Sequence, residues 1–174
     1  MSGVSTVRVS LRVNGRSVET DAEPQQQLVE TLRDELGLTG TKVGCDTGQC
    51  GTCVVQLDGL SVKSCLVLTV QTDAHEVTTI EGVAPEGGLD AVQESLRKEH
   101  GTQCGFCTPG VVMSLRDLLE REKEPSEARI REWLTGNLCR CTGYQSIVRG
   151  AQGVAAASVA APTVDTAVGT AAGS

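Results

Sequence analysis

The chain of 174 residues is long enough for one ordinary domain or for two small ones. Its formal net charge at pH 7 is −7 and its sequence pI is about 4.8, which argues against nucleic acid or an anionic membrane surface as the main partner. Aromatic residues make up 2% of the sequence, so a platform of aromatic side chains for stacking bases is also excluded. The core must be built from aliphatic side chains, and two domains with so lean a core need a further source of stability.

The N-terminal region lacks the pattern of a signal peptide, because no apolar run follows a basic start. The sequence also lacks a stretch of about 18 apolar residues, so no transmembrane segment is expected. Together these features predict a cytoplasmic protein. Eight cysteines in a reducing compartment are expected to be metal ligands rather than disulfides.

The chain begins with the pattern of a β-hairpin. Residues 7–13 alternate apolar and polar side chains, as a half-buried strand does, and Asn14 followed by Gly15 is a strong signal for a two-residue turn. We expect the return strand over residues 16–21. A short helix is predicted over residues 27–37, because leucine recurs there at every fourth position and defines one apolar face.

A loop and further strands follow this helix. Residues 40–53 are rich in glycine and cysteine and are predicted to form a loop. Residues 53–57 and 62–68 have the composition of strands and flank an Asp-Gly turn. Residues 77–80 are predicted to form the last strand of this part of the chain.

The pattern then changes to helices. Four are predicted: one marked by Leu89, Val92 and Leu96, one from Thr108 to about residue 122, one from Ser126 to about Gly136, and one over residues 145–157. Thr108 is expected to be an N-cap because Pro109 suits the first helical position, and Ser126 is expected to cap the third helix.

This order of elements predicts an α+β chain with two domains. Strands dominate residues 5–80 and helices dominate residues 81–157, and the glycines and prolines at 81–88 are typical of a linker. Residues 158–174 are small and low in complexity, which predicts a flexible tail.

The eight cysteines fall into two groups of four, one in each predicted domain. The first group has the spacing C-x4-C-x2-C with a fourth cysteine further on, and consists of Cys45, Cys50, Cys53 and Cys65. The second has a C-x2-C pair and a distant C-x-C pair, and consists of Cys104, Cys107, Cys139 and Cys141. Four thiolates are the ligand set of one [2Fe–2S] or [4Fe–4S] cluster.

The spacing of the first group favours iron–sulfur chemistry. C-x4-C-x2-C is the arrangement of plant-type ferredoxins, in which one loop wraps a cluster and points backbone N–H groups at its sulfurs. Glycines beside these cysteines, at positions 44, 48 and 51, permit such close approach. Zinc sites favour shorter pairs, so zinc stays an alternative mainly for the second group, whose thiols are expected to converge at the adjacent ends of two helices.

No other set of residues predicts chemistry of its own. His75 and His100 are isolated in the sequence and are expected to be surface residues. We find no serine, histidine and aspartate set, no phosphate-binding loop and no dinucleotide fingerprint, so no catalytic residue is predicted.

Three motifs together resemble the iron–sulfur subunit of the molybdenum hydroxylase, or xanthine oxidase, family. They are GCDTGQCGTCVVQLDG…VKSC at 44–65, QCGFCTPG at 103–110 and GNLCRCTGY at 136–144, and the resemblance covers about residues 5–155. Within the family, the first motif looks most like the small subunit of aerobic carbon monoxide dehydrogenase. Small subunits of N-heterocycle and aldehyde oxidoreductases are similar to nearly the same degree.

The resemblance implies a β-grasp ferredoxin-like domain followed by a four-helix bundle domain, each with one [2Fe–2S] cluster. The cluster of the second cysteine group would lie near a molybdopterin cytosine dinucleotide on a large subunit, with Gln103 and Cys141 in contact with the pterin. The cluster of the first group would lie nearer FAD on a medium subunit. The expected assembly is a dimer of heterotrimers in the cytoplasm, which could lie at the inner face of the cell membrane.

By this resemblance, the chain is an electron-transfer subunit that relays electrons from molybdenum to FAD and does not itself turn over substrate. We expect carbon monoxide as the substrate of the complex. The alternative is an N-heterocycle or aldehyde, as in hydroxylases of the nicotine, caffeine, quinoline or xanthine type. A free ferredoxin and a zinc-binding interaction module are the other two function classes considered.

Overall fold

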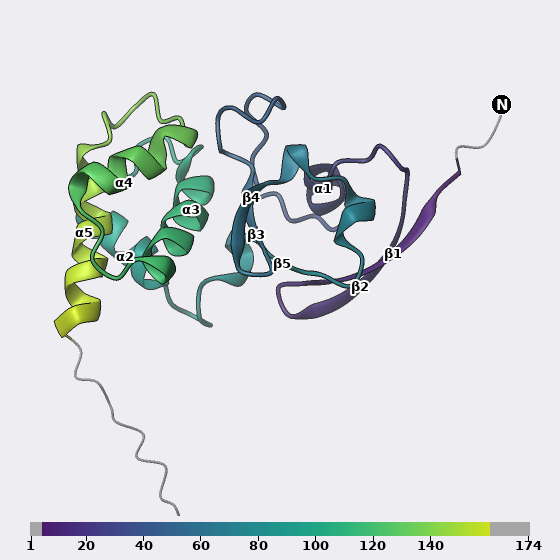
Figure 1. Cartoon of the computed structure of the whole chain (residues 1–174), viewed down its shortest axis with the longest axis horizontal. Helices are drawn as coiled ribbons and strands as arrows, with labels where there is room; N and C mark the ends of the chain where they lie inside the picture. Colours follow the sequence, from purple (N-terminus) through teal and green to yellow (C-terminus); the bar gives the residue numbers. More distant parts are fainter. Residues whose placement is uncertain (1–4, 161–174) are drawn as a thin grey trace, which may run out of the picture.

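The structure, a computed structural model, describes the backbone of residues 5–160 and the side chains of residues 5–157. Within this range a sheet with one short helix forms the N-terminal part, and a group of helices forms the C-terminal part beside it (Figure 1). The mixed α and β character predicted from the sequence is confirmed. None of the helices in the described residues is long and apolar enough to cross a membrane.

The N-terminal part is built on a five-stranded sheet with the order β2-β1-β5-β3-β4. Its strands are β1 (Val7–Val13), β2 (Arg16–Ala22), β3 (Val54–Leu57), β4 (Leu60–Lys63) and β5 (Glu76–Thr78). The β1–β5 pair is parallel and the other pairs are antiparallel. The predicted hairpin turn is confirmed, because Asn14 and Gly15 both have positive φ, at 51° and 76°.

One short helix covers this sheet. The helix α1 (Leu28–Glu30) continues as a π-helical turn over Thr31–Glu35, so the helix predicted for 27–37 exists but is shorter and changes its hydrogen bonding midway. Leu28 and Leu32 are fully buried and pack into a cluster with residues of β1, β3 and β5. Burial of aliphatic side chains on one sheet face therefore supplies the core, as the composition requires.

Two predicted strands differ from the observed ones. The strand predicted for 62–68 ends at Lys63, because Ser64–Leu66 form a 3₁₀ turn in which the buried Ser64 hydroxyl donates to the Cys53 carbonyl at 2.7 Å. The last strand ends at Thr78 rather than residue 80, since the N–H of Thr79 donates to the side chain of Asn14 at 2.8 Å instead of to a strand.

The C-terminal part contains the four helices expected from the periodicity: α2 (Ala91–Lys98), α3 (Thr108–Arg121), α4 (Glu127–Trp133) and α5 (Gln145–Ala160). Ser126 caps α4 as predicted, because its hydroxyl accepts from the N–H of Arg129 at 3.2 Å. The predicted cap at Thr108 is wrong: Cys107 occupies that position and Thr108 is already helical. The chain remains helical to Ala160, beyond the predicted limit at 157, and the rest of the predicted tail, 161–174, lies outside the described residues.

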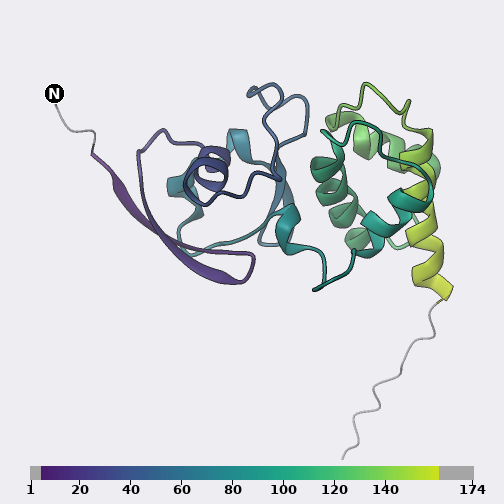
Figure 2. The same cartoon turned by 180° about the vertical axis from the view of Figure 1, so that it is seen from behind.

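The helix α3 packs across β3 and β4 and joins the two parts (Figures 1 and 2). Asp117 of α3 is 2% exposed and accepts from both the N–H of Ser61, at 2.8 Å, and its hydroxyl, at 2.5 Å. Burial raises the pKa of this carboxyl, but hydrogen bonds from Arg121 and Ser61 outweigh burial and the net pKa is lowered. A charged, fully bonded aspartate therefore fixes the edge strand β4 against the helices.

Candidate metal centres

The first cysteine group lies at one end of the sheet. Cys45 and Cys50 are on the loop that precedes β3, Cys53 directly precedes that strand, and Cys65 is in the 3₁₀ turn after β4. Cys53 and Cys65 are 3% and 5% exposed and pack against Val29, whereas Cys45 and Cys50 are partly exposed. The 3₁₀ turn over Ser64–Leu66, which ends β4 earlier than predicted, therefore brings Cys65 to the other three cysteines.

Backbone N–H groups converge on the Cys45 sulfur, as the ferredoxin-like spacing predicted. The sulfur accepts from Thr47 at 3.4 Å, from Gln49 at 3.4 Å and from Cys50 at 3.3 Å. A hydrogen bond from the Thr47 side chain, followed by these N–H groups, lowers the pKa of Cys45 to about 6. The loop is therefore arranged to stabilise negative charge on sulfur.

The second cysteine group lies where the helices meet. Cys104 and Cys107 precede α3, and Cys139 and Cys141 lie on the loop that follows α4. The sulfurs of Cys104 and Cys141 are 3.6 Å apart and both residues are exposed, while Cys139 is 7% exposed and interacts with Cys107. The predicted convergence at neighbouring helix ends is confirmed.

Both groups border one cavity of about 330 Å³. Its lining includes two thiols of the first group and all four of the second: Cys45, Cys50, Cys104, Cys107, Cys139 and Cys141. No set of three or more His, Cys, Asp or Glu side chains within residues 5–160 is arranged around a single ion. Two-iron clusters divide four thiolates between two metal atoms, so the donor chemistry of each group fits one [2Fe–2S] cluster.

Known families and proteins match almost the whole described chain. Residues 11–80 match the family described as "2Fe-2S iron-sulfur cluster binding domain", and residues 79–152 match "[2Fe-2S] binding domain". The gamma subunit of caffeine dehydrogenase from Pseudomonas sp. (strain CBB1) is 46% identical over 149 residues, which are 84% of this chain and 89% of that protein. The beta subunit of the 6-hydroxypseudooxynicotine dehydrogenase complex from Paenarthrobacter nicotinovorans is 46% identical over 146 residues, 83% of this chain and 91% of that one.

The chain belongs to the [2Fe–2S] small subunits of the molybdenum hydroxylases. The recognition made from the three cysteine motifs is thereby confirmed. A chain of quinoline 2-oxidoreductase from Pseudomonas putida 86 has the same fold, with a TM-score of 0.85 and 41% identity over 89% of this chain and 97% of that chain. This small subunit is a non-catalytic electron-transfer component of an oxidoreductase complex.

Two hydrogen bonds connect the cysteine loops of the small subunit directly. The N–H of Leu138 donates to the carbonyl of Cys50 at 2.8 Å, and the side chain of Asn137, 4% exposed, donates to the carbonyl of Gly51 at 3.2 Å. Sequence reasoning missed these contacts, because they join residues far apart in the chain and involve mainly backbone atoms. They fix the position of one cysteine group relative to the other.

Large apolar side chains are exposed to solvent around the second cysteine group. Phe106 is 47% exposed and Leu138 is 62% exposed, and both border the cavity shared by the thiols. Gln103, predicted to contact a pterin, is exposed beside Cys104. His75 and His100 are both exposed, as predicted, and neither lines that cavity.

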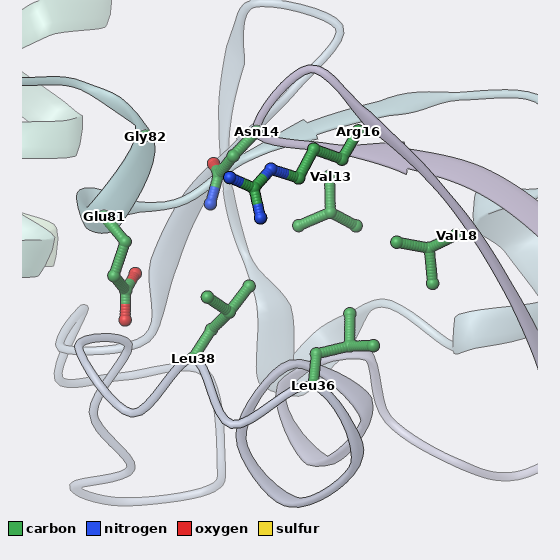
Figure 3. Close-up of a pocket in the computed structure, with 8 residues that line it drawn as sticks. All are labelled: Val13, Asn14, Arg16, Val18, Leu36, Leu38, Glu81 and Gly82. Carbon is green, nitrogen blue, oxygen red and sulfur yellow. The ribbon is translucent and has the colours of Figure 1, made fainter. Parts of the chain in front are cut away.

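A second cavity, of about 430 Å³, lies away from the thiols between the β1–β2 hairpin and the segment after α1 (Figure 3). Val13, Val18, Leu36 and Leu38 turn their side chains toward it. Two of its polar lining residues are engaged with other parts of the chain, since Asn14 bonds Thr79 and Glu81 accepts from the N–H of Gly40 at 2.7 Å. These contacts tie the hairpin to the end of the sheet and do not point to a ligand.

Thiol reactivity provides a first test of the site. In the metal-free chain, Cys45 should be alkylated by iodoacetamide at rates that rise across pH 6, because its pKa is lowered to about 6 and the thiolate is present above that pH. Burial, followed by interaction with Cys139, raises the pKa of Cys107 to about 12, so Cys107 should remain unmodified. Mass spectrometry of peptides after timed alkylation measures both rates, and equal rates at pH 7 in a metal-free chain that keeps the circular dichroism of the folded protein would contradict the geometry of these loops.

Proposed function

We propose that the small subunit passes electrons one at a time from a molybdenum centre on a large subunit to FAD on a medium subunit. One [2Fe–2S] cluster is held by Cys45, Cys50, Cys53 and Cys65, and the other by Cys104, Cys107, Cys139 and Cys141. Each cluster accepts and releases a single electron when bound. The observation that carries this proposal is the single cavity bordered by both thiol groups, whose loops are hydrogen bonded to each other.

We propose that the second cluster faces the molybdenum subunit. In support, Cys104 and Cys141 are exposed, and Phe106 and Leu138 present apolar surface beside them, as the centre of a protein interface does. Gln103 and Cys141 are the residues proposed to contact a molybdopterin cytosine dinucleotide. The first cluster then lies nearer FAD.

The finer architecture belongs to the same proposal. Residues 5–80 form a β-grasp domain, residues 81–157 form a four-helix bundle domain, and the complex is a dimer of heterotrimers in the cytoplasm. The packing of α2 and α3 against α5 supports the bundle. An assembly that buries the exposed cluster face needs an interface near or above about 1,600 Å² in total.

For the substrate of the complex we propose an N-heterocycle. The named relatives act on caffeine, on 6-hydroxypseudooxynicotine and on quinoline, and each of these compounds contains a nitrogen heterocycle. Carbon monoxide is the second candidate, favoured by the GCDTGQCG motif at 44–51.

The native complex, purified through a tag on this chain, tests the proposal. Reduction of an artificial dye should occur with one or more purines, pyridines or quinolines, and carbon monoxide and aldehydes serve as the competing substrates. Dye reduction by carbon monoxide alone would favour the second candidate. In gel filtration, elution of the native protein at 18.2 kDa, the mass of the chain alone, would instead contradict the relay and favour a free electron carrier.

A further inference from the structure

Two threonine hydroxyls lie at nearly the same distance from a cysteine sulfur, one in each group. The oxygen of Thr142 is 3.1 Å from the sulfur of Cys139, and the oxygen of Thr52 is 3.2 Å from the sulfur of Cys50. A cysteine bound to iron has no hydrogen, so only the hydroxyl can be the donor in either pair. Each hydroxyl has a single hydrogen, and its other partner decides where that hydrogen points.

The other partner of Thr142 is a donor. The N–H of Tyr144 donates to the Thr142 oxygen at 3.2 Å, which leaves the hydroxyl hydrogen free for the Cys139 sulfur. Tyr144 is held in place by its own hydroxyl, which accepts from the N–H of Cys139 at 2.7 Å and donates to the carbonyl of Asn137 at 3.0 Å. The turn from 139 to 144 therefore directs one hydroxyl group at one sulfur.

The other partner of Thr52 is an acceptor. Its hydroxyl donates to the carbonyl of Lys42 at 3.1 Å, and Thr52 is 5% exposed. We assign the single hydrogen to this bond, which turns a lone pair of the hydroxyl toward the Cys50 sulfur. Both hydroxyl oxygens lie at a similar distance from a cysteine sulfur, but Thr142 donates its hydrogen to that sulfur and Thr52 donates its hydrogen elsewhere.

We propose that Thr142 raises the reduction potential of the second cluster by donating a hydrogen bond to Cys139, and that Thr52 has no such effect on the first. This proposal rests on the proposed function, in which both cysteine groups bind clusters. Reduction adds negative charge to a cluster, and a donor at a ligand sulfur stabilises the reduced form. Thr142 is a positioning residue that acts through Cys139.

Redox titration of the native complex, followed by electron paramagnetic resonance, tests this assignment. Thr142→Val removes the hydroxyl at nearly constant volume and should move the potential of one [2Fe–2S] signal downward, leaving the other unchanged. Thr142→Ala should shift the same signal in the same direction, and Thr142→Ser should restore the original potential. The matched change Thr52→Val should leave both potentials unchanged.

A third position identifies which signal is which. Cys50 is a ligand of the first cluster in the proposed function, so Cys50→Ser should shift or remove the signal that Thr142→Val leaves unchanged. Equal potentials in Thr142→Val and the unmodified complex, or a downward shift in Thr52→Val, would overturn the inference. A single signal in the unmodified complex would instead contradict the proposed function.

Discussion

Cys107→Ser should abolish turnover with every electron acceptor that draws from FAD. Cys107 lies at the start of α3, where it is partly buried among the thiols of the second group and interacts with Cys139. Serine is a harder and more basic ligand than cysteine, so the second cluster should be lost or become unstable. Electrons released by the substrate would then have no path toward the flavin.

Single-turnover spectroscopy measures this effect. The substrate should still reduce the molybdenum centre of the Cys107→Ser complex, while FAD stays oxidised. Cys50→Ser is the matched comparison, because it affects the first cluster and should leave reduction of both molybdenum and the second cluster intact. Normal steady-state rates in either variant would contradict the order of the relay.

Gly110→Ala should separate the two cysteine loops and destabilise the chain. A Cβ atom at Gly110 would lie 2.1 Å from the carbonyl oxygen of Gly51 and 3.0 Å from the Cα of Thr52, and both of these are backbone atoms that cannot rotate away. Overpacking of this kind costs about 3 kcal/mol of unfolding free energy, which lowers the melting temperature by roughly 6 to 12 °C in a chain of this size.

The melting temperature is measured from the loss of visible absorption of the bound clusters as the protein is heated. Gly136→Ala is the control, since a Cβ atom there meets only the flexible side chain of Lys63, at 3.5 Å or more. The control should melt close to the unmodified protein. A Gly110→Ala protein that is as stable as the control would show that α3 does not pack on the first loop as described.

Local signals in the sequence predicted the elements well where a few neighbouring residues decide the structure. The hairpin turn at Asn14 and Gly15 and the cap at Ser126 follow from backbone conformation and one side chain. The prediction of a strand over 62–68 was wrong beyond Lys63, because the buried hydroxyl of Ser64 bonds the Cys53 carbonyl and bends the chain there. Strand propensity cannot anticipate a turn that a distant carbonyl imposes.

The eight thiols could be divided into two groups from spacing alone, and the structure brings each group together. Their arrangement relative to each other could not be predicted. It depends on the close approach of Gly51 to Gly110 and on the hydrogen bond from Leu138 to Cys50, which are contacts between residues distant in sequence. The different roles of Thr52 and Thr142 could not be predicted either, because each depends on which third residue the hydroxyl contacts in the folded chain.

Iron analysis combined with electron paramagnetic resonance of the reduced, anaerobically prepared complex tests the central claim most directly. Two occupied cysteine groups predict about four iron atoms per small subunit and two distinct [2Fe–2S] signals. About two iron atoms per small subunit with a single signal would show that one of the thiol groups holds no cluster, and the path from molybdenum to flavin through this chain would not exist.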